Sequence, residues 1–162
     1  MRKKFILSLM SAFTLLGCVT YEDDPYCKEY RFMTFKELRE SVQIQEPRAI
    51  KKAGKIYVYK EFLLVNDVNL GIHIIDNSDK ENPQPKAFLL LNGNIDIAVK
   101  DGFLYTDSFM DLVVFDINDV ENIKVVKRVN DAFTFDEYQA INEEDKYRCD
   151  FDTSEGVVGV KP

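Results

Sequence analysis

Short runs of apolar residues separated by polar turns fill the middle of the chain, and the same pattern is present twice. Residues 60–67, 71–76 and 79–82 are matched by residues 100–107, 111–116 and 119–122, with one offset of 40 residues and no gap. The runs are rich in β-branched and aromatic residues, which favour strands. A fixed period of this length predicts a repeat architecture.

Turn signals divide each copy into four short strands. Lys60-Glu61 and Asp101-Gly102 predict tight hairpin turns, and Asp-Gly accepts the positive φ that such turns need. Four antiparallel strands in about 40 residues are the size of one β-propeller blade. We therefore expect an all-β fold with two four-stranded, propeller-like blades, at about residues 55–94 and 95–134.

Two blades do not close a ring, because propellers generally have about four to eight. Exposed strand edges would remain, and such edges template pairing with other chains. Three explanations stay open. Residues 149–162 and an N-terminal helix cover the edges, or copies assemble through them, or the chain is a short or truncated member of a longer class.

One short helix is expected before the repeats. Thr34 and Glu37 have the spacing of a capping box, a hydroxyl acceptor with a carboxylate three positions later. The helix should run to about Ser41, with Phe35 and Leu38 facing inward. Pro47 excludes a longer helix.

The N-terminus has the pattern of an export signal. Three basic residues precede a mostly apolar run at residues 5–16, which is too short to span a bilayer as a helix. The run ends in Leu-Leu-Gly-Cys, which resembles the lipobox of bacterial lipoproteins. We expect a signal peptide at 1–17, lipidation of Cys18, a tether at 18–33 and the β-repeat domain at 34–162; an ordinary secretory signal is the alternative.

The acidic cluster near the N-terminus and the negative net charge are consistent with an exported protein. Residues 19–24 contain a short acidic cluster that resembles the surface-export signal of Bacteroidetes lipoproteins, or else form a solvated tether. The formal net charge of −7 becomes −10 once the three basic residues at 2–4 leave, so the surface repels nucleic acid. We expect a lipid anchor in the outer membrane, on the periplasmic or the cell-surface face.

Two cysteines remain after Cys18. In an oxidising compartment Cys27 and Cys149 are candidates for one disulfide that closes a very long loop. The alternative is two thiols that lie too far apart to meet.

The third strands of both copies carry a family resemblance. Residues 112–116 (LVVFD) and 71–76 (GIHIID), each followed by an Asp-x-x-Asn turn, resemble the LVIVD repeats of bacterial exported propeller-like proteins, many of them Bacteroidetes lipoproteins. Segments at 46–48, 54–58, 83–85, 107–108, 149–150 and 156–159 are similar to the N-terminal region of those lipoproteins. The resemblance covers most of residues 44–160. It implies more repeats than two and supplies no catalytic residues.

Candidate chemistry is sparse. His73, the only histidine, lies on an apolar strand and is expected to be a packed residue. Acids in the turns could ligate calcium, but they lack the alternate-Asp run with a central Gly, so turn formation is the stronger interpretation. These acids are Asp76, Asp79, Asp116 and Asp119. No carboxylate pair is singled out for glycoside hydrolysis.

Aromatic residues of the strands and loops could form a platform for a sugar or a peptide, although most strand aromatics pack in cores. They are Tyr57, Tyr59, Phe62, Tyr105 and Phe109. The sequence predicts a non-enzymatic, cofactor-free, lipid-anchored envelope module that presents loops to a protein or glycan. The alternatives are a remnant without independent activity and an envelope hydrolase.

Overall fold

The computed structural model describes residues 31–134 and 157–160. Their elements are, in order, β1 (Arg31–Thr34), α1 (Phe35–Glu40), β2 (Gln43–Gln45), β3 (Ala53–Tyr59), β4 (Phe62–Asp67), β5 (Gly71–Asp76), β6 (Gln84–Leu90), β7 (Ile97–Lys100), β8 (Phe103–Ser108), β9 (Asp111–Asp116), a 3-10 turn (Val120–Asn122), β10 (Lys124–Val129) and β11 (Val157–Val160). Within these ranges, no helix has the length and apolar character needed to cross a membrane.

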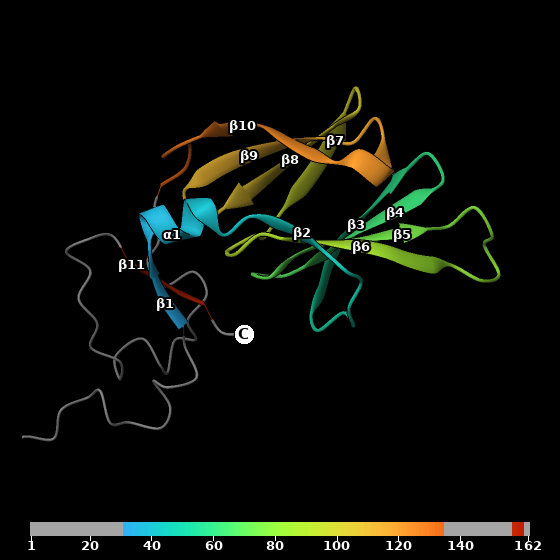
Figure 1. The fold of residues 1–162 in the computed structure, drawn as a ribbon, viewed down its shortest axis with the longest axis horizontal. Helices are drawn as coiled ribbons and strands as arrows, with labels where there is room; N and C mark the ends of the chain where they lie inside the picture. Colours follow the sequence, from blue (N-terminus) through green and yellow to red (C-terminus); the bar gives the residue numbers. More distant parts are fainter. Residues whose placement is uncertain (1–30, 135–156, 161–162) are drawn as a thin grey trace, which may run out of the picture.

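Two antiparallel sheets hold most of the strands (Figure 1). The first sheet has the order β2-β6-β5-β4-β3, and the second has the order β10-β9-β8-β7. Each repeat unit is therefore a meander of four neighbouring strands, and neither sheet closes on itself. The predicted all-β class with one short helix is confirmed.

The hairpin turns of the two units are equivalent. Tyr59 pairs with Phe62 around Lys60-Glu61, and Lys100 pairs with Phe103 around Asp101-Gly102. Lys60 and Asp101 both have positive φ, 53° and 51°, which the tight turn requires.

The gapless offset of 40 residues is wrong at β4 and β8. Phe62 pairs with Asp76 and Phe103 pairs with Asp116, so the offset is 41 before the β4–β5 connection and 40 after it. Three residues separate Asp67 from its partner Gly71, whereas two separate Ser108 from Asp111. The shorter second loop accounts for the missing residue.

Elements before the repeats extend the first sheet and cap the second. Strand β2 pairs with β6 as a fifth strand, which was not predicted, and it covers that edge. Helix α1 begins at the predicted capping box: the Thr34 hydroxyl accepts the Glu37 N–H, and the Glu37 carboxylate accepts the Thr34 N–H at 2.7 Å. Leu38 is fully buried, against Phe109 and Met110 of the β8–β9 turn.

The predicted tether overlaps the folded domain. Strand β1 begins at Arg31 and pairs along its length with β11, and Met33 is only 4% exposed. The domain therefore includes residues before Thr34. The predicted cover of the sheet edges by the helix is not what the described residues show, because α1 lies on a turn and β11 lies on β1.

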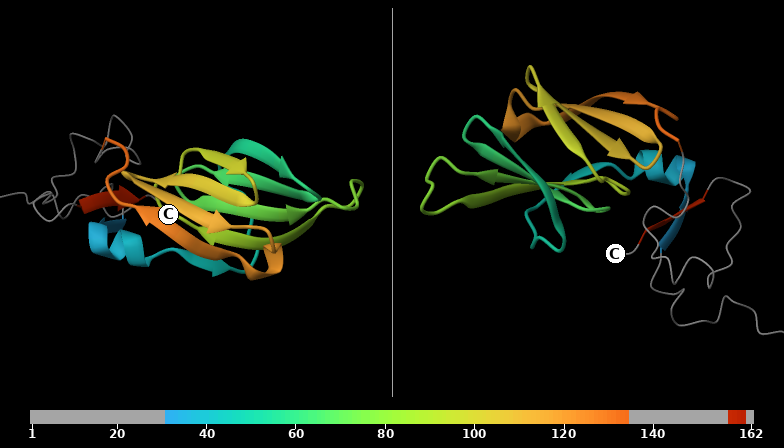
Figure 2. Two further views of the ribbon diagram at one scale, coloured as in Figure 1. Left: turned by 90° about the horizontal axis from the view of Figure 1, so that it is seen from above. Right: turned by 180° about the vertical axis from the view of Figure 1, so that it is seen from behind.

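A shared core lies between the two sheets, which face one another in two layers (Figure 2). Leu64, Ile74 and Leu89 of the first sheet are fully buried there with Leu104 and Phe115 of the second. Neither sheet could bury these side chains alone. The two units therefore form one domain.

Candidate functional site

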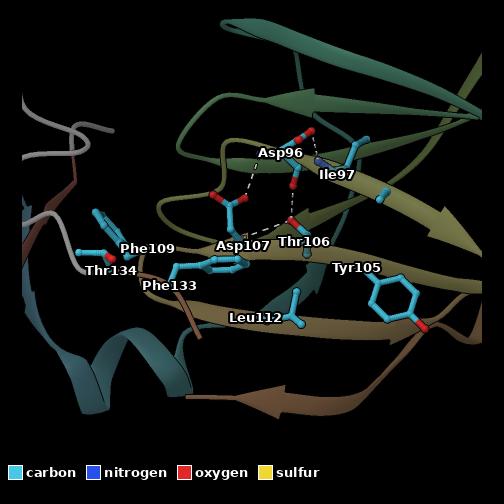
Figure 3. A pocket seen from close by; sticks show the side chains of 10 residues that line it. Asp96, Ile97, Tyr105, Thr106, Asp107, Phe109, Leu112, Phe133 and Thr134 are labelled. Atoms are coloured by element: carbon cyan, nitrogen blue, oxygen red, sulfur yellow. Dashed lines mark hydrogen bonds between the residues drawn. The ribbon is translucent and has the colours of Figure 1, made fainter. Parts of the chain in front are cut away.

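The outer face of the second sheet, turned away from the core, carries a hollow of about 370 Å³ (Figure 3). We call this surface the Tyr105 face; the cross-strand pairing places on it Ala98, Tyr105, Leu112, Val114, Lys127 and Val129. Ala98 is exposed, and Tyr105 and Leu112 are half-buried. In Figure 3, Phe109 and Phe133 lie toward one end of the hollow and Tyr105 toward the other.

Asp107 lines the hollow where strand β8 nears its end. One oxygen of its carboxylate accepts the backbone N–H groups of Ile95 and Asp96, both at 2.9 Å, and the Asn94 amide at 3.1 Å. Burial raises the pKa of Asp107, although these donors act in the opposite direction. The carboxylate thus fixes the chain just before β7.

The first unit has a similar contact. Asp67, at the end of β4, accepts the backbone N–H groups of Lys51 and Lys52 at 3.0 and 2.7 Å, just before β3. Burial alone would raise the pKa of Asp67, but the hydrogen bonds from His73, Lys52 and Lys51 hold it below its ordinary value. In each unit an aspartate near the end of the second strand thus fixes the entry to the first strand, although by the register Asp67 is equivalent to Ser108 and not to Asp107. The contact of Asp107 therefore has a structural role that does not depend on the hollow.

His73 is a packed residue, as predicted. Its ring is 3% exposed, Nε2 lies 3.0 Å from the Asp67 carboxylate, and the ring centroid lies 4.7 Å from that of Phe88. A substrate in solvent cannot reach this imidazole. The Asp67–His73 pair is structural.

Asp96 is the second acid at the hollow. Its carboxylate accepts the Ile97 N–H at 2.7 Å and lies 2.6 Å from the Lys55 ammonium of the first unit. The hydrogen bond from Lys55 lowers the pKa of Asp96, whereas burial raises that of Asp107. Diverging pKa values can mark an acid–base pair, but here contacts within and between the units account for both.

A buried polar connection joins the two units below the hollow. Asn94 bonds to Asn66 of β4 and to Thr106 of β8, and all three side chains are at most 2% exposed. Because each amide and hydroxyl would lose its hydration on burial, such groups need these bonds. The network fixes the two sheets relative to one another.

A second charged cluster joins the helix to the second sheet. Asp111, 0% exposed, accepts bonds from Arg39 of α1 and Arg128 of β10, both at 2.8 Å, and from the Asp131 N–H at 3.0 Å. Burial would raise the pKa of Asp111, but the hydrogen bond from Arg39 and those from the Asp131 N–H and Arg128 keep it below its ordinary value. Sequence reasoning missed this cluster because its members lie far apart in the chain.

Of the five predicted platform aromatics, Tyr105 and Phe109 line the hollow. Tyr59 and Phe62 instead pack against the shared core, and Tyr57 donates its hydroxyl to the Val99 carbonyl at 3.1 Å. Phe133, 48% exposed, completes the hollow and was not predicted. Its place depends on the Phe133 N–H, which bonds to the Met110 carbonyl at 2.9 Å.

The carboxylates considered as calcium ligands bond to their own turns. Asp76 accepts the Ser78 N–H and Asp116 the Asn118 N–H, at 2.9 and 3.0 Å. Asp79 and Asp119 likewise accept the N–H two residues on. Across residues 31–134 and 157–160, no group of three or more potential ligands is placed to hold a metal ion. Cys18, Cys27 and Cys149 lie outside the described residues.

No protein-family model, curated protein or solved structure matches the chain. The resemblance to LVIVD repeats therefore stays a prediction from sequence.

Proposed function

We propose that the chain is a non-enzymatic protein of the bacterial cell envelope, anchored by lipid at Cys18, which binds another protein through the Tyr105 face. The observation that carries the proposal is the hollow on that face. It combines the aromatic side chains of Tyr105, Phe109 and Phe133 with the aliphatic side chain of Leu112 on the outer surface of a sheet. Aromatic anchors in such hollows contribute much of the energy of protein interfaces.

The chemistry of the lining favours a protein over a glycan. Among the described residues that line the hollow, none is Lys, Arg, His, Asn or Gln. Asp96 and Asp107 already accept hydrogen bonds from their surroundings. A sugar needs several free polar groups to bind its hydroxyls, whereas an apolar side chain of a protein needs only the shape and the apolar wall.

The same contacts argue against catalysis. The acids at the hollow are held by the backbone and by Lys55, and His73 is buried against Asp67 in the other unit. An acid–base mechanism needs a group with a pKa tuned to its task within reach of the substrate. The described residues offer a binding surface instead.

Anchoring is tested by labelling cells with a radioactive fatty acid. We expect the wild-type chain to carry the label and to sediment with membranes. Cys18→Ser should lose both properties, because the cysteine is the proposed attachment point, whereas Cys27→Ser should keep them. Unlabelled wild-type protein, or label retained by Cys18→Ser, would contradict the anchor.

Protein binding is tested with a photo-reactive phenylalanine, p-benzoylphenylalanine, at Phe133 on the rim of the hollow. The matched control carries the same residue at Ile44, which is 52% exposed and lies outside the lining. Irradiation of cells should give a discrete protein adduct from Phe133 alone. The adduct should disappear in Leu112→Asp, because an acid on the face opposes apolar docking. Glycan adducts, or equal products from both positions, would contradict the proposal.

A further inference from the structure

The two units are equivalent in their hairpins but bury opposite faces in the core. Phe62 and Phe103 each follow a two-residue turn, so Leu63 is equivalent to Leu104 and Leu64 to Tyr105. Leu64 points into the shared core in the first unit, and Leu104 does so in the second. Tyr105, the equivalent of Leu64, and Leu63, the equivalent of Leu104, therefore lie on outer faces.

The cross-strand pairs also show that the two units bury opposite faces of their sheets. The core receives the pair Leu64–Ile74 from the first sheet and the pair Leu104–Phe115 from the second. Their equivalents are Tyr105–Val114 on the Tyr105 face and Leu63–Ile75 on the outer face of the first sheet. The sheets thus stack front to back, as successive blades do, and not as mirror-like halves.

Part of the outer face of the first sheet is also apolar and exposed, whereas elsewhere on that face Arg48 lies over the Phe88 ring. We call the exposed part the Val58 face; it carries Ile56, Val58, Leu63, Ile75 and Pro85. Val58 is 66% and Ile56 60% exposed, and Leu63 and Ile75 are half-buried. Contiguous exposed aliphatic side chains of this kind mark an interaction surface.

We infer that the Tyr105 face of one copy receives the Val58 face of a second copy of this chain, in the front-to-back packing that joins the two units within one copy. The inference rests on the proposed function and names its protein partner. The two outer faces carry the positions that form the internal sheet–sheet contact, so a second copy continues an interface the chain already makes.

The hollow fits this occupant. Inside the chain, the Tyr57 hydroxyl of β3 reaches the Val99 carbonyl of β7. The equivalents of these two residues are Ala98 and Val58, by the offset of 41 residues that the hairpins define. Ala98 lacks the tyrosine side chain and leaves the space at the hollow, and the exposed Val58 of the second copy lies opposite it. A small residue thus meets a protruding one.

This contact is heterologous, because two different faces meet. Each copy keeps one unused face, so the assembly either closes as a ring or extends. Lipid anchoring of both copies in one membrane raises their effective concentration and favours a contact of modest area. A symmetric dimer that joins two Val58 faces is a different arrangement, and the two are separable by experiment.

The direct test is disulfide capture in the full-length, membrane-bound protein. Two differently tagged copies are expressed together, one with Val58→Cys and the other with Ala98→Cys, and treated with a mild oxidant. A disulfide forms when the two Cβ atoms come within about 4.5 Å. We expect a mixed dimer from this combination alone. Two copies with Val58→Cys, two with Ala98→Cys, and wild-type chains, which report on the native cysteines, are the controls.

Charge variants supply the second measurement. Because a carboxylate buried in an apolar contact is costly, Val58→Glu and Ala98→Glu should each reduce self-association, read from the mass of the detergent-solubilised protein, by about tenfold or more. Each variant keeps the face that the other has lost. A mixture of the two should therefore form a dimer that does not extend.

Three results would overturn the inference. They are disulfide capture between two Val58→Cys copies, no capture in any combination, and no response of the mass to either charge variant. A Phe133 photo-adduct with a different protein, together with no mixed disulfide, would leave the proposed protein binding in place and remove only the second copy as its partner. A charge variant that fails to fold is recognised because it lacks a cooperative unfolding transition. In that case the disulfide capture between Val58→Cys and Ala98→Cys tests the inference.

Discussion

The buried carboxylate of Asp111 offers the sharpest test of what holds the domain together. The side chain is 0% exposed and accepts four hydrogen bonds from Arg39, Arg128 and the Asp131 N–H, at 2.8 to 3.1 Å. It therefore joins helix α1 to strands β9 and β10. We consider the substitution Asp111→Asn, which keeps the shape and removes the charge.

The expected loss follows from the burial of the three charges. Breaking a buried ion pair by removing one partner costs about 3–5 kcal/mol. Arg39 and Arg128 are 26% and 14% exposed, so water partly compensates for the lost carboxylate. We expect the free energy of unfolding to fall by about 3 kcal/mol, a large part of the 5–15 kcal/mol, roughly, that stabilises a domain.

Urea unfolding at neutral pH, followed by circular dichroism, measures this loss as a shift of the midpoint at constant slope. Asp131→Asn is the matched control, because Asp131 contacts the same Arg39 at 3.4 Å but is 73% exposed. An exposed pair contributes about 0–1 kcal/mol. Equal losses in the two variants, or a loss below about 1 kcal/mol in Asp111→Asn, would refute the assigned role.

Low pH should reduce the difference in unfolding free energy between the wild type and Asp111→Asn. The pKa of Asp111 is held below its ordinary value, so its contribution is complete above the unfolded-state pKa of about 3.9 and is lost as the pH falls through the lower folded-state pKa. The wild type should therefore lose more stability than Asp111→Asn between about pH 5 and pH 2. If the unfolding free energies of the two proteins fell in parallel as the pH decreased, Asp111 would not be the group that titrates.

Three further substitutions test single features. Thr34→Ala removes the capping hydroxyl of α1 and should lower the free energy of unfolding by about 1 kcal/mol; Lys36→Ala, on the exposed side of the same helix, should change it little. Asp67→Ala leaves the Lys51 and Lys52 N–H groups without their acceptor, so hydrogen exchange at these two amides should accelerate together, and unchanged rates would contradict the assigned contact. Gly93→Ala places a Cβ against the Phe109 ring at a residue with φ of +73°, and should cost about 2 kcal/mol while weakening the Phe133 photo-adduct.

The hairpins and the capping box were predictable because their signals are local. Asp101-Gly102 provides the turn geometry, and Thr34 and Glu37 lie one helical turn apart, so the neighbouring sequence determines both. Strand β2 was missed because Gln43–Gln45 is short and polar. It becomes a strand only because the edge of β6 is available to it.

The hydrophobic pattern did not predict which face of each sheet is buried in the core. Leu63 and Leu64 are adjacent and both apolar, so alternation gives no sign of which one faces the core. The β8–β9 loop is one residue shorter than the β4–β5 loop, and a gapless alignment cannot take this into account. Such an alignment matches Leu104 to Leu64 and wrongly implies that both units bury the same face. The hollow depends on the burial of opposite faces, since only the true register places Ala98 where the first unit has Tyr57.

Front-to-back stacking has a consequence for how such a chain can change during evolution. Each unit presents one face to the unit before it and the other face to the unit after it. Duplication or deletion of DNA encoding one whole unit therefore leaves every remaining contact of the same kind. A face-to-face pair with a two-fold axis has no such freedom, because a third unit finds no matching surface. Gene length in this architecture can thus vary in steps of about 40 codons without a new core being required.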